Sequence, residues 1–290
     1  MDFIEWSESM SVGIPLIDQD HKIIVSLINQ FHQNISAEAD QKVLGSTLNT
    51  LIDYTLFHFS REEQLMKACK YPSFKAHKSQ HEDLAQQVTD IAQRFFEKKQ
   101  DVIKEELLEF LKSWLINHIL KQDMGYRPYA EDNAEVNRLA TSLQSGKHQP
   151  QMLSNEPFIP VSVNWEEITI LLISQNQNFS HIISTILKMA NVRDIRQVYQ
   201  TEEALQALKE LIPDLIVYAW QADDQEAISF INNLRAAADK RIADIPVLLI
   251  SAREEQGARE SALAAGANHF IEEPIGMHTF FEAAIETLKG

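Results

Sequence analysis

The apolar residues of this chain follow one spacing in its first half and another in its second half. Residues 16–120 contain a single proline and a single glycine, and their apolar side chains recur at intervals of three and four residues. That interval is the period of an amphipathic α-helix, and short turns between periodic stretches favour antiparallel neighbours. The first half is therefore predicted to be an up-down-up-down bundle of four helices, at residues 18–37, 41–68, 73–98 and 102–119.

Beyond residue 165, short aliphatic runs alternate with amphipathic stretches. Runs that are apolar throughout are typical of parallel strands, because helices cover both faces of such a sheet. The expected strands are ITILLIS, LIVYA, PVLLIS and HFIEE, with DIRQV as a weaker one. The expected helices are 177–189, 201–211, 224–236, 254–265 and 277–289. The predicted fold class is multidomain: an all-α antiparallel four-helix bundle followed by an α/β five-stranded parallel sheet, flavodoxin-like in type.

The segment between the two halves, residues 145–165, holds three prolines and no hydrophobic period, which is typical of a linker. Just before it, one more helix is expected, with a narrow apolar stripe of Val136, Leu139 and Leu143. The predicted domains are a helical domain at 1–130, a helical extension and linker at 131–165, and an α/β domain at 166–290.

The charge and the cysteine content narrow the class of protein. The formal net charge is −16, and acidic residues outnumber basic ones in both halves. Neither nucleic acid nor an anionic membrane is therefore an expected partner. The single cysteine, Cys69, excludes an internal disulfide, the N-terminus lacks the pattern of a signal peptide, and no apolar run is long enough to span a membrane. These features predict a cytoplasmic protein.

Histidines and acids occupy the apolar faces of the predicted bundle helices. His77 and His81, for example, are four residues apart and so share one face of a helix. Burying a polar group without a partner costs about 1–3 kcal/mol, and a domain is stable by only about 5–15 kcal/mol. A bound metal removes this cost, because each imidazole then donates a lone pair. The pattern predicts seven inward metal ligands: His21, His58, Glu62, His77, His81, His118 and Asp123.

Seven ligands are too many for one tetrahedral zinc ion. Carboxylates can bridge two metal ions. With two bridging carboxylates and one bridging oxygen, two six-coordinate ions would use all seven side chains and leave one position open. Imidazole and carboxylate ligands around an open position suit iron and dioxygen chemistry.

Four segments, SVGIPLIDQDH, HFSREEQLM, YPSFKAHKSQH and WLINHILKQD, resemble the motifs of bacterial hemerythrins. The spacings H-x3-E, H-x3-H and H-x4-D are all met, and the isolated His21 precedes them. The resemblance covers about residues 1–130 and implies an O2-binding centre of two non-haem iron ions joined by an oxo bridge. It implies one iron held by His77, His81 and His118, and a second, with the open position, held by His21 and His58. Glu62 and Asp123 would bridge the two ions.

The same resemblance places three further side chains around an O2 pocket: Trp114, Leu115 and Ile119. Ordinary core packing explains these three equally well. Glu63 follows Glu62 directly, and neighbouring helical residues point about 100° apart, so Glu63 is expected to face solvent.

The second half resembles the receiver domain of response regulators in ITILLISQNQNF, PDLIVYAW, IPVLLISA and ALAAGANHFIEEPI. Ser174 and Gln175 stand where a receiver has its two Mg²⁺-binding acids. Ala219 replaces the phospho-accepting Asp, Glu273 replaces the Lys, and Ser251 keeps the hydroxyl. Since Ala219 has no nucleophile and Glu273 would repel a phosphate, the resemblance implies a degenerate phosphorylation site, that is, a pseudo-receiver.

The leading interpretation is an O2 or redox sensor that is not an enzyme and that signals through its phosphorylation-incompetent receiver-like domain. Its ligand would be O2, with NO as an alternative, and the receiver-like domain would contact a protein partner or a second copy. One alternative is an O2 carrier or store in which that domain only mediates oligomerisation. Another is a di-iron peroxidase or oxidase, against which the histidine-rich ligand set argues.

Overall fold

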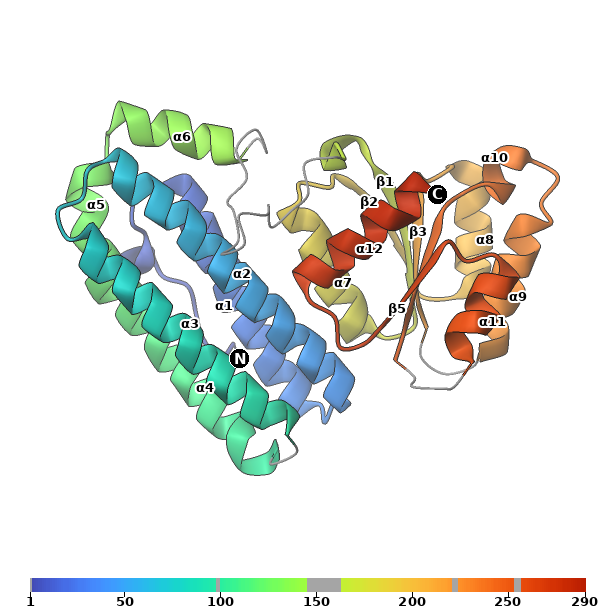
Figure 1. Cartoon of the computed structure of the whole chain (residues 1–290), viewed down its shortest axis with the longest axis horizontal. Helices are drawn as coiled ribbons and strands as arrows, with labels where there is room; N and C mark the ends of the chain where they lie inside the picture. Colours follow the sequence, from blue (N-terminus) through green and yellow to red (C-terminus); the bar gives the residue numbers. More distant parts are fainter. Residues whose placement is uncertain (1, 98–99, 145–162, 221–223, 253–256) are drawn as a thin grey trace. The chain divides into compact units, whose positions relative to one another are not determined.

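The structure, a computed structural model, describes residues 2–97, 100–144, 163–220, 224–252 and 257–290. Contacts within the chain group them into two compact units, one helical and one built around a sheet (Figure 1). The predicted fold class, a helical bundle followed by a five-stranded parallel sheet with helices, is confirmed. Most of the expected linker lies outside the described residues.

Four long helices form the first unit: α1 (Pro15–Ser36), α2 (Gln41–Ala68), α3 (Phe74–Phe96) and α4 (Gln100–Asn117). A short 3-10 turn, η1 (Glu8–Met10), precedes them. Pro15 occupies the first turn of α1, where its missing N–H leaves no hydrogen bond unmade. The inward stripe of α1, which includes Ile17, Ile24 and Ile28, is fully buried, as its spacing predicts.

The fourth helix continues well past its expected end at residue 119. After α4 the chain forms a π-helical turn, η2 (His118–Asp123), and then the α-helix α5 (Met124–Ala130). The expectation that Asp123 lies beyond the end of the helix is therefore wrong. The helical backbone runs on because the residues after Ile119 contain no proline or glycine before Gly125, and Pro128 falls only in the last turn of α5.

The additional helix predicted after the bundle is α6 (Ala134–Gln144). Val136 and Leu143 are buried, as expected, whereas Leu139 is only partly buried and Ala140 takes a buried place on the stripe. Asn133 accepts hydrogen bonds from the first free backbone N–H groups of α6, which fixes where that helix begins. The apolar face of α6 packs in one cluster with residues of α1, α2 and α5.

The second unit is a parallel sheet in the order β2-β1-β3-β4-β5. Its strands are β1 (Thr169–Ser174), β2 (Asp194–Val198), β3 (Leu215–Trp220), β4 (Val247–Ser251) and β5 (His269–Glu272). The central strands β3 and β4 are buried along their whole length, whereas the edge strand β2 is buried only at Val198. Its position at the edge explains why DIRQV gives the weakest strand signal.

Helices cover both faces of this sheet (Figure 1). One face carries α7 (Gln177–Met189) and α12 (Met277–Lys289), and the other carries α8 (Thr201–Glu210), α9 (Asp224–Arg235) and α11 (Ala258–Ala265). A 3-10 turn, η3 (Trp165–Glu167), precedes β1. The four-residue helix α10 (Lys240–Ala243) was not expected, because one helical turn is too short for a periodic pattern.

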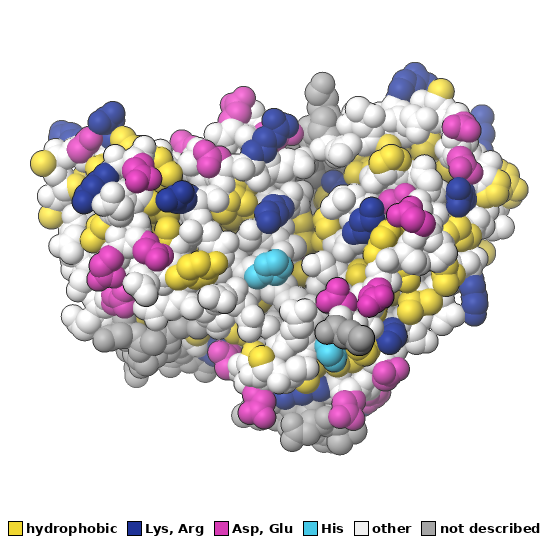
Figure 2. Space-filling view, turned by 180° about the vertical axis from the view of Figure 1, so that it is seen from behind, with side chains coloured by type: hydrophobic (Ala, Val, Ile, Leu, Met, Phe, Trp, Pro, Cys, Tyr) yellow, Lys and Arg dark blue, Asp and Glu magenta, His cyan; other side chains and the backbone are white. Residues whose placement is uncertain are grey.

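Among the residues that the structure describes, none of the helices combines the length and the hydropathy that crossing a bilayer requires. On the face drawn in Figure 2, Lys and Arg side chains lie scattered among Asp and Glu side chains.

Candidate metal centre

The seven predicted ligands come from three long helices of the bundle and from the π-helical turn that follows α4, and all seven are buried. His21 lies on α1, His58 and Glu62 lie on α2, His77 and His81 lie on α3, and the last two belong to the π-helical turn η2. No side chain among them is more than 3% exposed. The structure thus brings together, inside one helical unit, the residues His21, His58, Glu62, His77, His81, His118 and Asp123.

The π-helical turn brings His118 and Asp123 to the same face. Five residues apart in an α-helix, they would point about 140° away from each other. A π-helical turn closes its hydrogen bonds between residues i and i+5, so these two positions come into line. The Nε2 atom of His118 lies 3.1 Å from Oδ1 of Asp123. The H-x4-D spacing in the sequence is the signature of this turn.

The ligand atoms form two groups that share one carboxylate. The first group is Glu62 with His77, His81 and His118, and the second is Glu62 with His21 and His58. Within each group the donor atoms lie within 4.8 Å of one another. The Oε2 atom of Glu62 lies 3.1 Å from Nε2 of His81 and 3.9 Å from Nε2 of His58, so it faces both groups.

Asp123 also lies between the two groups, and it turns a different oxygen to each. Its Oδ2 is 3.3 Å from Nε2 of His21. Its Oδ1 is 3.3 Å from Nε2 of His77 and 3.1 Å from Nε2 of His118. Neighbouring ligands of an octahedral ion at about 2.1 Å lie roughly 3 Å apart. The separations therefore fit donors arranged around a metal, and Asp123 lies within reach of histidines from both groups.

The hydrogen bonding of these side chains tests whether a metal fits. The ring nitrogens of His21 and His58, Nε2 of His77, and both oxygens of Glu62 and of Asp123 are buried and make no hydrogen bond of good geometry. Buried polar atoms in proteins are nearly always paired, and leaving so many unpaired would be very costly. A cation at this position would accept the lone pairs of all these atoms, so the donor set fits a metal centre.

Asp20, which the sequence analysis overlooked, supports His58 from behind. Its Oδ1 accepts hydrogen bonds from the hydroxyl of Tyr54 at 2.6 Å and from Nη1 of Arg61 at 2.9 Å. Its Oδ2 lies 3.7 Å from Nδ1 of His58. Burial raises the pKa of Asp20, but the charge of Arg61 together with the contacts to His58 and Tyr54 outweighs burial and lowers the pKa overall. The only sequence signal was that Asp20 directly precedes His21 in a buried stretch of α1.

Glu63 is not directed to solvent, so that expectation is wrong. Its side chain is only 15% exposed, and its Oε1 lies 3.2 Å from Nδ1 of His81. Lys78 holds its other oxygen at 3.2 Å. Burial lowers the pKa of His81, but the carboxylates of Glu62 and Glu63, which lie 3.1 and 3.2 Å from its two ring nitrogens, together outweigh burial and raise the pKa to about 9. A carboxylate at Nδ1 fixes the ring so that Nε2 points into the cluster.

Tyr126 is a further residue that the sequence analysis did not find. It lies on α5, is fully buried, and its ring centroid is 6.1 Å from that of His77. Burial, together with the charges of Glu62 and Asp123, raises the pKa of the phenol well above its usual value. Tyr126 was overlooked because it lies beyond the expected end of the fourth helix.

The three residues predicted around an O2 pocket are all buried beside the cluster. Leu115 and Ile119 lie in the core, while Trp114 packs its ring 6.1 Å from that of His118. Phe59, which was not predicted, stacks on His81 at a centroid distance of 3.9 Å. Phe59 and Trp114 thus pack aromatic rings against two of the predicted ligands.

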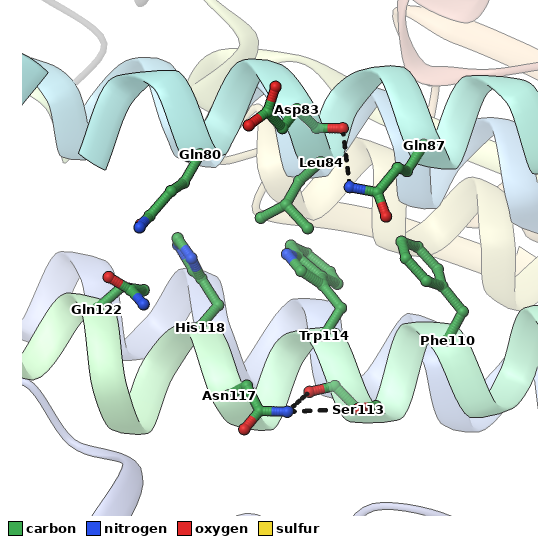
Figure 3. Close-up of a pocket in the computed structure, with 10 residues that line it drawn as sticks. All are labelled: Gln80, Asp83, Leu84, Gln87, Phe110, Ser113, Trp114, Asn117, His118 and Gln122. Atoms are coloured by element: carbon green, nitrogen blue, oxygen red, sulfur yellow. Dashed lines mark hydrogen bonds between the residues drawn. The ribbon is translucent and has the colours of Figure 1, made fainter. Parts of the chain in front are cut away.

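An open pocket of about 470 Å³ lies between α3 and α4 and reaches Trp114 and His118 (Figure 3). Leu84 on α3 and Phe110 on α4 add apolar surface next to Trp114. Gln80 and Gln122 lie near His118. Leu115 and Ile119 do not line this pocket. The pocket brings solvent close to one ligand of the cluster.

Comparison with known proteins agrees with this geometry. Residues 12–130 match the family model "Hemerythrin HHE cation binding domain". Bacteriohemerythrin of Stenotrophomonas maltophilia is 33% identical over 146 residues, which cover 50% of this chain and 92% of that protein. The chain belongs to the hemerythrin family. Bacteriohemerythrin of Pseudomonas aeruginosa is 36% identical over 126 residues, 43% of this chain and 80% of that protein.

The hemerythrin resemblance drawn from the motifs is thus confirmed, and so is the resemblance to receiver domains. Residues 170–285 match the model "Response regulator receiver domain". A solved structure of wild-type hemerythrin is 30% identical, covers 44% of this chain and 98% of its own, and has a TM-score of 0.41. A putative response regulator from Chloroflexus aurantiacus is 18% identical, covers 42% and 98%, and has a TM-score of 0.39.

In this hemerythrin-family chain, the positions of receiver chemistry meet at the carboxyl edge of the sheet. Ser174 ends β1 and pairs with Ala219 on β3, and Ser251 ends β4 beside β5. Ala219 is 2% exposed and offers only a methyl group. Glu273, just after β5, is buried at 3% exposure.

Gln175 directly follows β1, and its side chain is hydrogen-bonded to a residue of α9. Its Nε2 donates a hydrogen bond to Oε2 of Glu226 at 3.1 Å. The neighbouring residues 221–223 and 253–256 lie outside the described residues. At this edge the described residues place the side chains of Ser174, Gln175, Ala219 and Glu273, which are the positions that the sequence analysis assigned to receiver chemistry.

Proposed function

We propose that this protein binds O2 at a di-iron centre and reports the state of that centre to a protein partner through its receiver-like domain. The observation that carries the proposal is the position of two carboxylates between two groups of buried histidines. Glu62 belongs to both groups, and Asp123 turns one oxygen to each. Two bridging carboxylates imply two metal ions, and a histidine-rich donor set favours iron.

The chain supplies unequal numbers of histidines to the two ions. In the proposal His77, His81 and His118 hold one iron, and His21 and His58 hold the other. The second iron therefore has one protein ligand fewer, and its free position is where a diatomic ligand binds. When present, the pair of irons supplies the electrons that a bound O2 requires. The surrounding apolar side chains exclude water from this position, which favours reversible binding.

We infer that the protein is a binding protein and not an enzyme. Di-iron sites that oxidise substrates are rich in carboxylates and use Glu-x-x-His motifs. Here five of the seven donors are histidines and two are carboxylates. Glu63 and Asp20 lie behind ligands, where they orient imidazoles, and neither faces the space that a substrate would occupy. NO, which is also a diatomic ligand of iron, is expected to compete for the same position.

The receiver-like domain is proposed to act as a docking surface without phosphoryl transfer. Ala219 has no oxygen to accept a phosphoryl group, and the amide of Gln175 cannot replace a Mg²⁺-binding carboxylate in charge. The buried carboxyl of Glu273 stands where a receiver uses a lysine to neutralise phosphate. The strands and covering helices that would form a protein-binding surface are nevertheless all present.

Metal analysis and optical spectroscopy of the purified full-length protein test the proposal. We expect two irons per chain, and spectra that change reversibly between oxygenated and O2-free buffer. His118→Ala should lose iron, whereas the control His32→Ala should keep it, since His32 lies on α1 outside the cluster and stacks on Phe3. A single zinc ion, or equal loss of iron in both variants, would refute the di-iron assignment.

The choice between a sensor and a carrier or store depends on coupling to the receiver-like domain. A carrier would bind O2 without any change in the association of that domain. Pull-down from native cells under oxic and anoxic conditions, using the full chain, should recover a partner in only one of the two states. The same recovery in both states would favour the carrier.

A further inference from the structure

A row of three tyrosines leads from the metal centre to the surface of the helical unit. The ring of Tyr126 lies 6.1 Å, centroid to centroid, from that of His77. The ring of Tyr71 lies 6.2 Å from Tyr126 and 6.4 Å from His77, and the ring of Tyr129 lies 5.4 Å from Tyr71. Each pair is therefore within the range of direct aromatic contact.

Exposure rises along this row. Tyr126 is fully buried, Tyr71 is half-buried, and Tyr129 is 46% exposed. Tyr126 and Tyr129 lie three residues apart on α5, so they share one side of that helix. Tyr71 lies in the turn between α2 and α3, and its ring contacts the rings of both Tyr126 and Tyr129. The row thus begins at a metal ligand and ends in solvent.

The packing of Tyr71 depends on a glycine. A Cβ atom added at Gly125 would lie 2.7 Å from the hydroxyl of Tyr71, closer than real Cβ contacts allow. The backbone conformation at Gly125 is helical, so the glycine is not needed for its φ angle. What Gly125 provides is room for Tyr71 to approach α5, although glycine is a weaker helix former than alanine.

We propose that Tyr126, Tyr71 and Tyr129 form a relay that carries oxidising equivalents from the metal centre to the surface. The inference rests on the proposed di-iron function, because it needs a redox-active metal beside His77. Phenols are among the side chains most easily oxidised by one electron, and rings in near contact exchange electrons rapidly. A hydroperoxide that reaches an O2-binding iron centre leaves oxidising equivalents there. The relay would remove them as a protective side reaction, and the proposed function of the protein remains O2 binding.

With hydrogen peroxide as the oxidant, the electrons and protons of the relay balance. Peroxide takes up two electrons and two protons at the centre and becomes two molecules of water. Each electron arrives by one passage along the row, in which Tyr71, directly or by way of Tyr126, is oxidised and reduced again. In each passage Tyr129 finally gives up one electron along the row and its phenolic proton to solvent. Two passages supply the two electrons, and solvent supplies the two protons that peroxide takes up. A thiol reductant in solution returns a hydrogen atom to each Tyr129 radical and is itself oxidised to a disulfide.

The proposal is tested on the iron-loaded full-length protein with hydrogen peroxide and a nitroso spin trap. Peptide mass spectrometry should locate the trapped radical on Tyr129 in the wild type and should find none there in metal-free protein. Tyr71→Phe removes one oxygen atom and interrupts the row, so the adduct at Tyr129 should be lost. The control Tyr199→Phe changes a tyrosine of similar exposure, 40%, in the receiver-like domain and should leave the adduct at Tyr129 intact.

A second variant covers the case in which Tyr71→Phe disturbs folding. Tyr129→Phe alters only the exposed end of the row, and the trapped radical should then move to Tyr71. Iron content and the O2-dependent spectrum, measured on the same samples, separate the two proposals. Iron-loaded wild type that binds O2 but gives no adduct at Tyr129 overturns the relay alone, and wild type without iron overturns both.

Other outcomes decide against the relay directly. Trp114 lies beside His118 and Trp6 lies 6.4 Å from His21, so each offers another aromatic exit from the cluster. An adduct on either tryptophan, with none on Tyr129, overturns the proposal. So does an adduct on Tyr129 that is equally strong in Tyr71→Phe or in metal-free protein.

Discussion

Removing the charge of Glu63 should weaken metal binding without changing any metal-binding atom. The Oε1 atom of Glu63 lies 3.2 Å from Nδ1 of His81, while Nε2 of the same ring faces the cluster. The carboxylate fixes the orientation and the tautomer of the imidazole and makes Nε2 more basic. In Glu63→Gln the side chain keeps nearly the same volume, but its amide no longer carries the negative charge that holds the Nδ1–H.

The size of the effect follows from the position of the contact. Loss of a carboxylate behind a metal-binding histidine typically costs 10- to 100-fold in affinity, or about 1.4–2.7 kcal/mol. Glu63 is 15% exposed and shares its charge with Lys78, which weakens its hold on His81. We therefore expect a loss near the lower end, about tenfold.

A neighbouring glutamate provides the matched control. Glu82 also pairs with Lys78, at 3.1 Å, but its side chain is 61% exposed. Among the described residues, His81 pairs with Glu62 and Glu63 and not with Glu82. Glu82→Gln therefore removes the same kind of charge from the same lysine. Anaerobic titration of metal-free protein with ferrous iron against a competing chelator should show weaker binding in Glu63→Gln only. Equal affinities in the two variants would refute the view that Glu63 orients His81.

Four further outcomes are expected. His118→Ala should lower the thermal unfolding midpoint of protein purified with its metal more than that of chelator-treated protein, because metal binding contributes to folding stability; equal shifts would contradict a ligand role. In chelator-treated protein the pKa of His81 is raised from 6.5 to about 9. The contribution of His81 to stability is therefore complete below pH 6.5 and is lost as the pH rises toward 9. An unfolding midpoint that does not fall between these pH values would contradict this expectation. Intact mass after incubation with acetyl phosphate and Mg²⁺ should show no added phosphate, whereas a labile adduct would mean that the receiver-like domain is active. Hydrogen exchange in residues 124–144 should differ between the O2-free and O2-bound states, since α5 follows Asp123 directly and α6 follows α5 after a short turn. Identical exchange would favour independent domains.

The local pattern of the sequence was sufficient to predict the long helices, the strands and the inward positions of the ligands. Periodicity assigns a face to each residue of a helix, so His77 and His81 could be placed in the core before any partner was known. The same holds for the buried strands, whose continuous aliphatic runs predict two covered faces. The receiver positions Ala219 and Glu273 were likewise found from their places within the segments that resemble receiver motifs.

Only the tertiary structure decided which groups face one another across helices. Glu63 was expected in solvent because its own helix turns it away from Glu62, yet α3 covers it with His81 and Lys78. Asp20 is buried because Tyr54 and Arg61 reach it from α2, and no spacing within α1 reveals that. The π-helical turn that aligns His118 with Asp123 departs from the regular period, so a periodic pattern led to a wrong helix end. Local spacing determines where a side chain points, but the neighbours that it meets depend on the packing of segments distant in sequence.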